Sequence, residues 1–228
     1  MKTIQYDGFE LEHFDSAYNF RKYQISLIKK FIKGNFLEVG AGKGGLIPYY
    51  RKFAKHITII EPEKKLFNIL KKKYLKKKIK IKNETIKDTK KKFDTIIYYD
   101  VLEHIKNDLD EVKQASKKLN KNGFLIFSVP AYQTFYSDFD KSVGHYRRYN
   151  KQNFLSLEKK TDLKIEKLAY YDSIGFLFLI LNNLFSLKQT NLKSKIYLWN
   201  LLMPISRAID FLTFNKFGKS LLCVFKKC

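Results

Sequence analysis

A short apolar run passes directly into a glycine-rich turn at residues 36–45, which read FLEVGAGKGG. The run Phe36–Val39 predicts a short strand, and the residues after the turn predict a helix at 46–54. Glycines in such a turn permit positive φ angles and let a ligand approach the backbone at the mouth of the strand. This segment therefore predicts a phosphate- or cofactor-binding site between the strand and the helix.

The spacing of the glycines narrows the kind of ligand. No Gly-Lys-Ser/Thr ends the turn, so it is not a P-loop. Gly40, Gly42 and Gly45 match the G-x-G-x-x-G spacing of dinucleotide-binding dehydrogenases, which keeps that class as a competing interpretation. Glu38 lies two residues before the first glycine and favours a cationic ligand, because a carboxylate there would repel a pyrophosphate.

Strands and helices alternate along the rest of the chain. Strands are expected at 57–60, 78–82, 93–99, 124–129, 164–171 and 220–225, and helices at 16–33, 63–76, 107–120 and 151–160. This alternation predicts an α/β fold with a Rossmann-like, mostly parallel sheet of seven strands and helices on both faces. Without an internal repeat or a linker, residues 1–228 are expected to form a single domain with a helical leader at 1–34.

Three segments interrupt this alternation. Residues 121–123 read Lys-Asn-Gly and are expected to cap the helix that precedes the fifth strand. Residues 131–150 form a polar and aromatic loop, and loops longer than about 12–15 residues are usually functional. Residues 173–213 predict two or three apolar helices, a helical insertion or lid before the last strand.

The formal net charge is +23, from 45 basic and 22 acidic residues. Such a charge is typical of proteins that bind nucleic acids or anionic membranes. However, 40 of the basic residues are Lys and only five are Arg, while Ile is common and Ala is scarce. Lys and Ile have AT-rich codons, so a strongly AT-biased genome would raise the charge without any binding role. Both explanations stay open.

Composition also excludes several protein classes. A chain with 45% hydrophobic residues, including 20 Phe and 15 Tyr, is not largely disordered. Cys223 and Cys228 are the only cysteines, which excludes a disulfide scaffold and leaves too few ligands for a zinc site. The opening residues lack the apolar region of a secretory signal, so a cytoplasmic protein is expected.

The apolar insertion raises the question of membrane contact. Its longest apolar stretch, Ile174–Leu181, is shorter than the ~20 residues of a membrane span. The helix there is apolar nearly all round, so it is either buried or faces lipid. With Lys188, Lys193 and Lys195 just beyond it, a peripheral contact with the inner face of an anionic membrane is an alternative to burial.

Three motifs occur together and in order: LEVGAGKG at 37–44, ITIIEP at 57–62 and YYDVLEHI at 98–105. In these motifs the chain resembles the class I S-adenosylmethionine-dependent methyltransferases, and the resemblance extends over nearly the whole chain. Four further stretches resemble a bacterial subgroup associated with cell-surface glycan genes: NFRKY at 19–23, SVPAYQTFYSDFDKSVGHYRRY at 128–149, DSIG at 172–175 and FGKSLLCV at 217–224. The resemblance implies S-adenosylmethionine as cofactor and a small-molecule, glycan or lipid-linked acceptor, methylated at oxygen or nitrogen.

The resemblance also assigns cofactor-binding roles to Glu38, Gly40, Gly42, Gly44, Glu61, Glu84 and Asp100. The glycines would let the cofactor lie against backbone, and Glu38 would reach its ammonium group. Glu61 ends the second strand and can accept both ribose hydroxyls; an acid at a helix N-terminus before Pro62 is the alternative. Glu84 would meet the adenine amino group, where the family usually has Asp, and Asp100 would face the cofactor from the fourth strand.

A hydroxyl acceptor needs a base, and His is the usual base near neutral pH. Among four histidines, His145 in the long loop and His104 near the end of the fourth strand are the candidate catalytic residues. His13, in the leader, and His56, in a helix–strand turn, are expected to be solvated.

A metal site is a second interpretation of the same region. Asp100, Glu103, His104 and His145 offer oxygen and imidazole ligands that can converge on one helical face. Glu103 more often serves as an acid at a helix start, and His104 as a wall beside the cofactor. No metal is therefore predicted.

The acceptor-binding residues are expected in the long loop and are Tyr132, Tyr136, Arg147 and Arg148. Adjacent arginines in a chain that otherwise uses Lys suggest a need for the planar guanidinium fork. The arginine pair would hold a phosphate or carboxylate of the acceptor, or else clamp the loop internally through Asp138 or Asp140. The tyrosines would wall the acceptor cavity, or simply pack.

Two other functions compete with this interpretation. The charge supports an RNA or DNA methyltransferase, but residues 98–101 read Tyr-Tyr-Asp-Val rather than the D/N-P-P-Y/F of amino-directed enzymes, and no Cys follows a catalytic strand. Nucleic acid is therefore not the expected partner. A binding module without activity is disfavoured by the complete set of motif residues. The acceptor's identity and the oligomeric state are not predicted.

Overall fold

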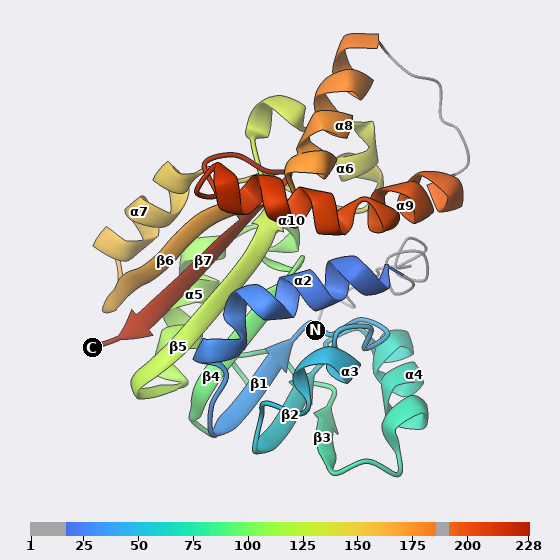
Figure 1. Ribbon diagram of the computed structural model, residues 1–228. Coiled ribbons are helices and arrows are strands. Elements are labelled where there is room, and N and C mark those ends of the chain that lie inside the picture. The colour runs from blue at the N-terminus through green and yellow to red at the C-terminus, as the bar shows by residue number, and fades with distance from the viewer. Residues whose placement is uncertain (1–16, 186–191) are drawn as a thin grey trace.

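The computed structural model describes residues 17–185 and 192–228, so leader residues 1–16, with His13, and also Lys188 lie outside the described residues. The described strands are β1 Asn35–Val39, β2 His56–Ile60, β3 Ile79–Lys82, β4 Phe93–Tyr99, β5 Leu119–Pro130, β6 Leu163–Tyr171 and β7 Ser220–Lys227. They form one sheet in the order β3-β2-β1-β4-β5-β7-β6 (Figure 1). Strands β1 to β5 pair in parallel, and β7 runs antiparallel to β5 and β6. The predicted Rossmann-like fold is confirmed.

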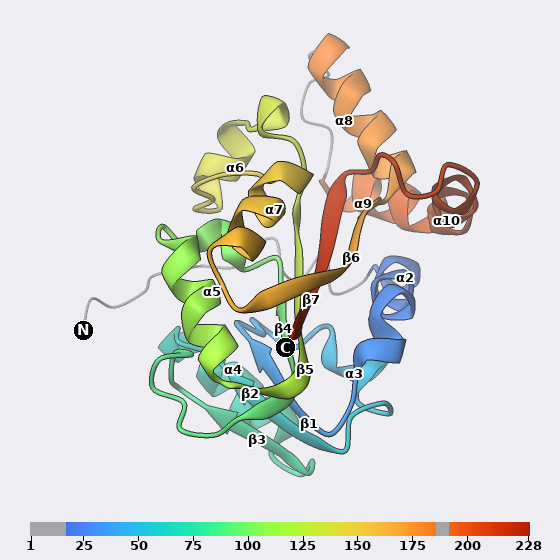
Figure 2. The ribbon, with the colours of Figure 1, turned by 90° about the vertical axis from the view of Figure 1, so that its left-hand side faces the viewer.

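Helices cover both faces of this sheet, as predicted (Figure 2). Helices α2 Tyr18–Ile28 and α3 Ile47–Tyr50 lie on one face, and α5 Asp108–Lys117 and α7 Lys151–Lys159 lie on the other. Helix α4 Lys64–Tyr74 follows β2 and contacts β3. Each helix turns an apolar stripe toward the sheet, because apolar side chains recur at the helical period.

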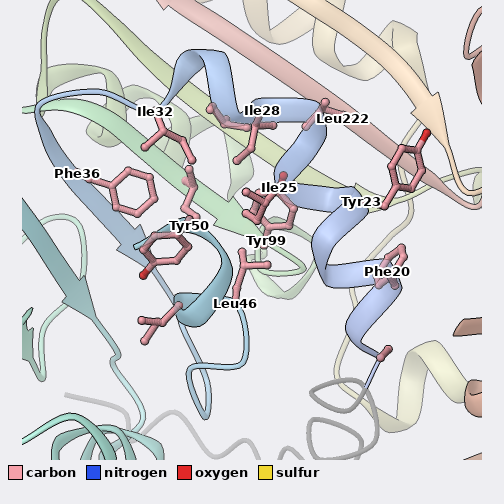
Figure 3. Packing of buried hydrophobic residues seen from close by; sticks show 14 of the residues in the cluster. Phe20, Tyr23, Ile25, Ile28, Ile32, Phe36, Leu46, Tyr50, Tyr99 and Leu222 are labelled. Carbon is pink, nitrogen blue, oxygen red and sulfur yellow. The ribbon is translucent and has the colours of Figure 1, made fainter. Parts of the chain in front are cut away.

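Two hydrophobic clusters hold the layers together. On the first face, α2 projects Phe20, Ile25 and Ile28 toward the side chains of the sheet (Figure 3). On the other face, Phe127 of β5 packs against Phe154 of α7, with ring centroids 6.0 Å apart. Buried on both faces, the central strands are held rigidly, and their carboxyl ends meet at one edge of the sheet.

The boundaries of two predicted elements are corrected by the structure. Residues 121–123 do not cap a helix: α5 ends at Lys117, and β5 already begins at Leu119. The buried Leu119 pairs with Phe93 in the sheet, so strand pairing outweighs the local capping signal. The helix expected at 46–54 is the single turn of α3.

The long loop at 131–150 is structured. It contains a 3-10 turn, Gln133–Phe135, and a short helix, α6 Asp138–Ser142. Its two ends are joined because Tyr149 N–H donates to the Pro130 carbonyl (2.9 Å) and Tyr132 N–H donates to the Tyr149 carbonyl (2.8 Å). The loop therefore returns to its starting point and is presented as one unit at the carboxyl edge of the sheet.

Between β6 and β7, the described residues form three helices, as predicted: α8 Ser173–Phe185, α9 Leu192–Leu201 and α10 Met203–Leu212. Helices α9 and α10 lie nearly in line, and α8 projects away from the sheet (Figures 1 and 2). Among the described residues, none of the helices is both long and apolar enough to cross a membrane.

Candidate active site

A cavity of about 1000 Å³ lies at the carboxyl edge of the sheet. The ends of β1, β2 and β4 form one side of it, and residues 139–146, which include part of α6, together with Arg148 form another. Trp199 of α9 and Lys219, just before β7, also line the cavity. This is the place where α/β sheets bind ligands, and the volume suits a nucleotide-sized molecule.

The glycine turn approaches this cavity in the backbone conformation that the sequence requires. Gly40, Gly42 and Gly44 have φ angles of 68°, 56° and 76°, and the first two line the cavity. A Cβ on Gly40 would lie 2.8 Å from a methyl group of Val101, so a side chain does not fit there. The N–H of Gly40 donates to the carbonyl of Ile60 (2.9 Å), which ties the turn to the end of β2.

Glu61 lies at the end of β2 and is held by the glycine turn itself. Its carboxylate accepts hydrogen bonds from the N–H of Gly42 (2.9 Å) and of Glu63 (3.0 Å). The residue lines the cavity but is 4% exposed, and burial raises its pKa to about 7. A carboxylate fixed here can accept hydrogen bonds from a ligand that carries a pair of hydroxyl groups.

Glu38 is buried at the end of β1 and lines the same cavity. The hydroxyl of Tyr50 in α3 donates to its carboxylate at 2.5 Å. Burial and the neighbouring Glu38 raise the pKa of Tyr50 well above its usual value, so this tyrosine stays a neutral donor. Glu38 is thereby fixed in orientation beside the cavity.

Asp100 and Glu84 differ in their relation to the cavity. Asp100 follows β4 with a φ of 55°, lines the cavity and lies 3.9 Å from Nη1 of Arg21 in α2. The carboxylate of Glu84 instead accepts from Lys82 (3.1 Å) and from the hydroxyl of Thr89 (2.7 Å). Thr85 and its neighbour Ile86 line the cavity, whereas Glu84 does not.

His145 and Arg148 both bind the carboxylate of Asp140, which is fully buried in α6. Nδ1 of His145 lies 2.8 Å from Oδ1 of Asp140. The guanidinium of Arg148 donates through Nε (2.9 and 3.0 Å) and Nη2 (2.8 Å) to both carboxylate oxygens. Although burial opposes ionisation, the hydrogen bonds from His145 and Arg148 hold the pKa of Asp140 well below its usual range.

Arg148 therefore clamps the loop internally, which was one of the two predicted roles of the arginine pair, whereas Arg147 binds residues outside the loop. Arg148 binds Asp140, and Arg147 pairs with Asp108 (2.8 Å) and donates to the carbonyl of Lys106 (2.7 Å). Arg147 does not line the cavity, whereas Arg148 does. Within the described part of the chain, Nη1 of Arg148 is buried and has no hydrogen-bond partner.

The two predicted acceptor tyrosines support the loop from outside the cavity lining. Tyr132 stacks on Tyr170 of β6, with ring centroids 4.8 Å apart. The hydroxyl of Tyr136 donates to the carbonyl of His145 at 2.5 Å. Tyr136 thus positions the backbone that carries His145.

Glu103 and His104 lie beside His145 in the cavity lining. The rings of His104 and His145 are 4.6 Å apart, and Oε1 of Glu103 lies 3.9 Å from Nε2 of His145. Burial lowers the pKa of His104 to about 4, so it is neutral at pH 7. Ligand atoms of these three residues lie within 4.8 Å of one another, a donor set that suits a divalent metal. Asp100, the fourth residue considered for a metal, does not belong to the group.

Arg21, Trp199 and Lys219 are among the cavity residues that were not singled out from the sequence. Arg21 and Lys219 lie within NFRKY and FGKSLLCV, so the motifs contained a signal for them. Trp199 is the only tryptophan of the chain, and its indole N–H donates to both oxygens of Asp172 (2.9 and 3.0 Å).

Comparisons with known proteins agree with this geometry. The model of the methyltransferase domain family matches residues 12–168, and the chain belongs to this family. The ubiquinone biosynthesis O-methyltransferase of Pelagibacter ubique (strain HTCC1062) is 28% identical over 211 residues, which cover 78% of this chain and 84% of that protein.

Solved structures of methyltransferases share the fold. The N-methyltransferase NodS from Bradyrhizobium japonicum WM9, in complex with S-adenosylhomocysteine, is 14% identical with a TM-score of 0.60, over 93% of this chain and 88% of that chain. The geranyl diphosphate C-methyltransferase from Streptomyces coelicolor A3(2) is 9% identical with a TM-score of 0.68, over 100% of this chain and 86% of that chain. The protein is an S-adenosylmethionine-dependent methyltransferase, and S-adenosylmethionine is its cofactor.

Proposed function

We propose that the protein, acting as a single domain, methylates an oxygen or nitrogen atom of a small-molecule, glycan or lipid-linked acceptor. When bound, S-adenosylmethionine supplies an electrophilic methyl carbon, so the chain's own residues must align the acceptor and remove its proton. The observation that supports this is the shared cavity, which is lined by the glycine turn and Glu61 on one side and by His145 on the other. Cofactor and acceptor sites would thus adjoin.

His145 is proposed as the base, with Asp140 as the residue that positions it. Because the pKa of Asp140 is well below its usual range, its carboxylate is ionised at pH 7 and accepts only. Nδ1 of His145 must then carry the proton that it shares with Asp140. In the neutral imidazole this leaves the lone pair on Nε2, where it can take a proton from an acceptor hydroxyl.

For the cofactor, Glu61 would bind the ribose hydroxyls, and Glu38 and the glycine turn would hold the methionine part. Asp100 would face the cofactor from β4. Glu84 would reach the adenine only after breaking its hydrogen bonds with Lys82 and Thr89. The neighbouring residues Thr85 and Ile86 already line the cavity and are therefore better placed to contact the adenine.

Oxygen is the acceptor atom with the most support, because the related protein of Pelagibacter ubique is named an O-methyltransferase. The loop motif at 128–149 supports a glycan-related acceptor through the subgroup that it resembles. A lipid-linked acceptor requires contact with a membrane. The cytoplasmic location expected from the sequence stays a prediction.

The test is transfer of a labelled methyl group to fractionated metabolites, lipids, glycans and nucleic acids of the source cells. We expect label in a small-molecule, glycan or lipid fraction. His145→Gln, which cannot act as a base, should lower turnover on that acceptor by about 10²- to 10⁴-fold while leaving cofactor affinity unchanged. His56→Gln, at an exposed histidine, is the matched control. Label in nucleic acid alone, or wild-type turnover of His145→Gln, would contradict the proposal.

A further inference from the structure

Helix α8 is strongly apolar, yet it is not buried. Residues 176–184 read FLFLILNNL, and every one of them is at least partly exposed. Leu177 is 47% exposed and Leu184 is 67% exposed. A helix that is apolar nearly all round is normally enclosed by protein or by lipid. Because α8 projects from the sheet in Figures 1 and 2, the described protein does not enclose it.

Helices α9 and α10 also carry exposed apolar side chains. Their buried side chains recur at steps of three and four residues and face the protein: Ile196, Trp199, Met203, Ser206 and Asp210. The opposite side carries large apolar side chains that are exposed: Tyr197, Leu198, Leu201, Ile205, Phe211 and Leu212. Phe214, just after α10, is 82% exposed. We call these residues, with Leu177 and Leu184 of α8, the insertion surface.

The charge of this region has one sign. Residues 173–219 contain a single acidic residue, Asp210, and its carboxylate is buried, accepting from the hydroxyl of Tyr23 and the N–H of Asp172. In α9, in α10 and in the turn after α10, the exposed charged residues are all basic: Lys193, Lys195, Arg207 and Lys216. Exposed apolar side chains among cations, without acids, complement an anionic lipid surface.

We propose that the insertion surface docks on an anionic lipid bilayer. Apolar side chains would enter the boundary between headgroups and acyl chains, and the basic residues would pair with lipid phosphates. A second copy of the chain fits less well, because a twofold interface brings the same patch of each copy together and would place these cations against each other. Exposed apolar side chains and basic residues suit such docking whatever the methyl acceptor is.

Docking there would also place the cavity beside the membrane. Trp199 of α9 lines the cavity, while Tyr197 and Leu198 on the other side of the same helix belong to the insertion surface. Only the width of one helix, about 10 Å, separates the two. An acceptor held in the bilayer by a lipid tail would therefore have its polar group within reach of the cavity.

The test is flotation of the full chain with vesicles of phosphatidylcholine mixed with phosphatidylglycerol, and with vesicles of phosphatidylcholine alone. We expect flotation with the mixed vesicles only, and weaker flotation at high salt. Leu198→Gln combined with Phe211→Gln should lower partition at least tenfold, because two apolar side chains leave the bilayer. Lys193→Gln combined with Lys195→Gln should lower it about 25-fold, since each basic residue near the surface contributes about fivefold.

Matched controls lie on α4 and at Leu75 directly after it, at the other end of the molecule (Figure 1). Leu75→Gln removes an apolar side chain that is 72% exposed, and Lys71→Gln combined with Lys72→Gln removes two exposed charges. The α4 variants should float like the wild type. Calorimetric titration with S-adenosylmethionine shows that each variant is folded and separates a failure of docking from a failure of the methyltransferase assignment.

Three results would overturn the proposal. The first would be a wild type that fails to float with mixed vesicles. The second would be insertion-surface variants that float like the wild type. Alternatively, light scattering shows a dimer that Leu198→Gln and Phe211→Gln together dissociate, while no protein floats; the surface is then an interface between two copies.

Discussion

Replacing Asp140 by Asn tests the loop network where it is most deeply buried. The substitution keeps the size of the side chain and removes its charge, so Arg148 is left with a buried cation, and the capping contacts of Asp140 with Ser137 in α6 weaken. Breaking one partner of a buried ion pair costs about 3–5 kcal/mol. For a chain of this length that corresponds to a fall in melting temperature of roughly 6–20 °C.

The assay is urea unfolding at pH 7, with Asp138→Asn as the control two residues away in the same helix. The Asp138 side chain is almost fully exposed and pairs with the exposed Lys141, so solvent screens this ion pair and its loss should leave the free energy of unfolding nearly unchanged. Because the pKa of Asp140 is depressed in the folded protein, its contribution is complete above its unfolded pKa and disappears as the pH falls through the folded value.

The two variants should therefore differ at pH 7 and converge in strong acid. If Asp140→Asn is no less stable than Asp138→Asn at pH 7, the buried network does not hold the loop and the reasoning is refuted. Positioning is read separately from stability: at a temperature where the variant is folded, turnover should fall while its cofactor affinity stays unchanged, since the amide no longer fixes the tautomer of His145.

Further predictions concern the cofactor side of the cavity. Glu61→Ala should weaken S-adenosylmethionine binding by about 1.5–3 kcal/mol in calorimetry, as expected for lost charged hydrogen bonds, and unchanged affinity would exclude the ribose role. Because burial raises the pKa of Glu61 to about 7, wild-type affinity should rise between pH 6 and 8, and a flat profile would count against an ionised carboxylate. Without cofactor, the contribution of Glu61 to the free energy of unfolding should fall by about 3 kcal/mol as the pH rises from about 4.5 to above 7, and Glu61→Gln should remove this contribution, which is read as the difference between the pH profiles of the two proteins in urea titrations. Gly44→Ala should destabilise the fold by about 1–3 kcal/mol, because its φ is 76° and a Cβ would lie 2.8 Å from Leu70; Gly45→Ala, outside the positive-φ glycines, is the control that should not.

The fold was predictable because local and long-range preferences agree over most of the chain. The run Phe36–Val39 is apolar, precedes a glycine turn and lies at the centre of a parallel sheet, so each signal points to the same structure. Local and long-range preferences disagree at residues 121–123, where a local capping pattern competes with strand pairing. Leu119 gains burial and a partner in Phe93, contacts that no local pattern contains.

The site was predictable where a strand end fixes it. Glu38 lies near the end of β1, Glu61 and Asp100 directly follow β2 and β4, and all three line the cavity as their positions imply. The loop residues were harder, because side chains in a loop of this length find partners that are remote in sequence. Arg147 contacts Asp108 of α5, and Tyr132 stacks on β6, so neither enters the cavity.

The arginines show why residue type carried more information than net charge. Arg148 forks around a buried carboxylate, Arg147 bridges a carboxylate and a carbonyl, and Arg21 donates to Gln24 beside the cavity. A lysine offers one compact charge and cannot make the two-pronged contact of Arg148. A bias toward Lys elsewhere in the chain would therefore leave arginine where the fork is needed. Arg148→Lys keeps the positive charge, yet it should lower the free energy of unfolding by a large part of the amount that Asp140→Asn lowers it. An Arg148→Lys protein as stable as the wild type would show that charge alone holds the loop.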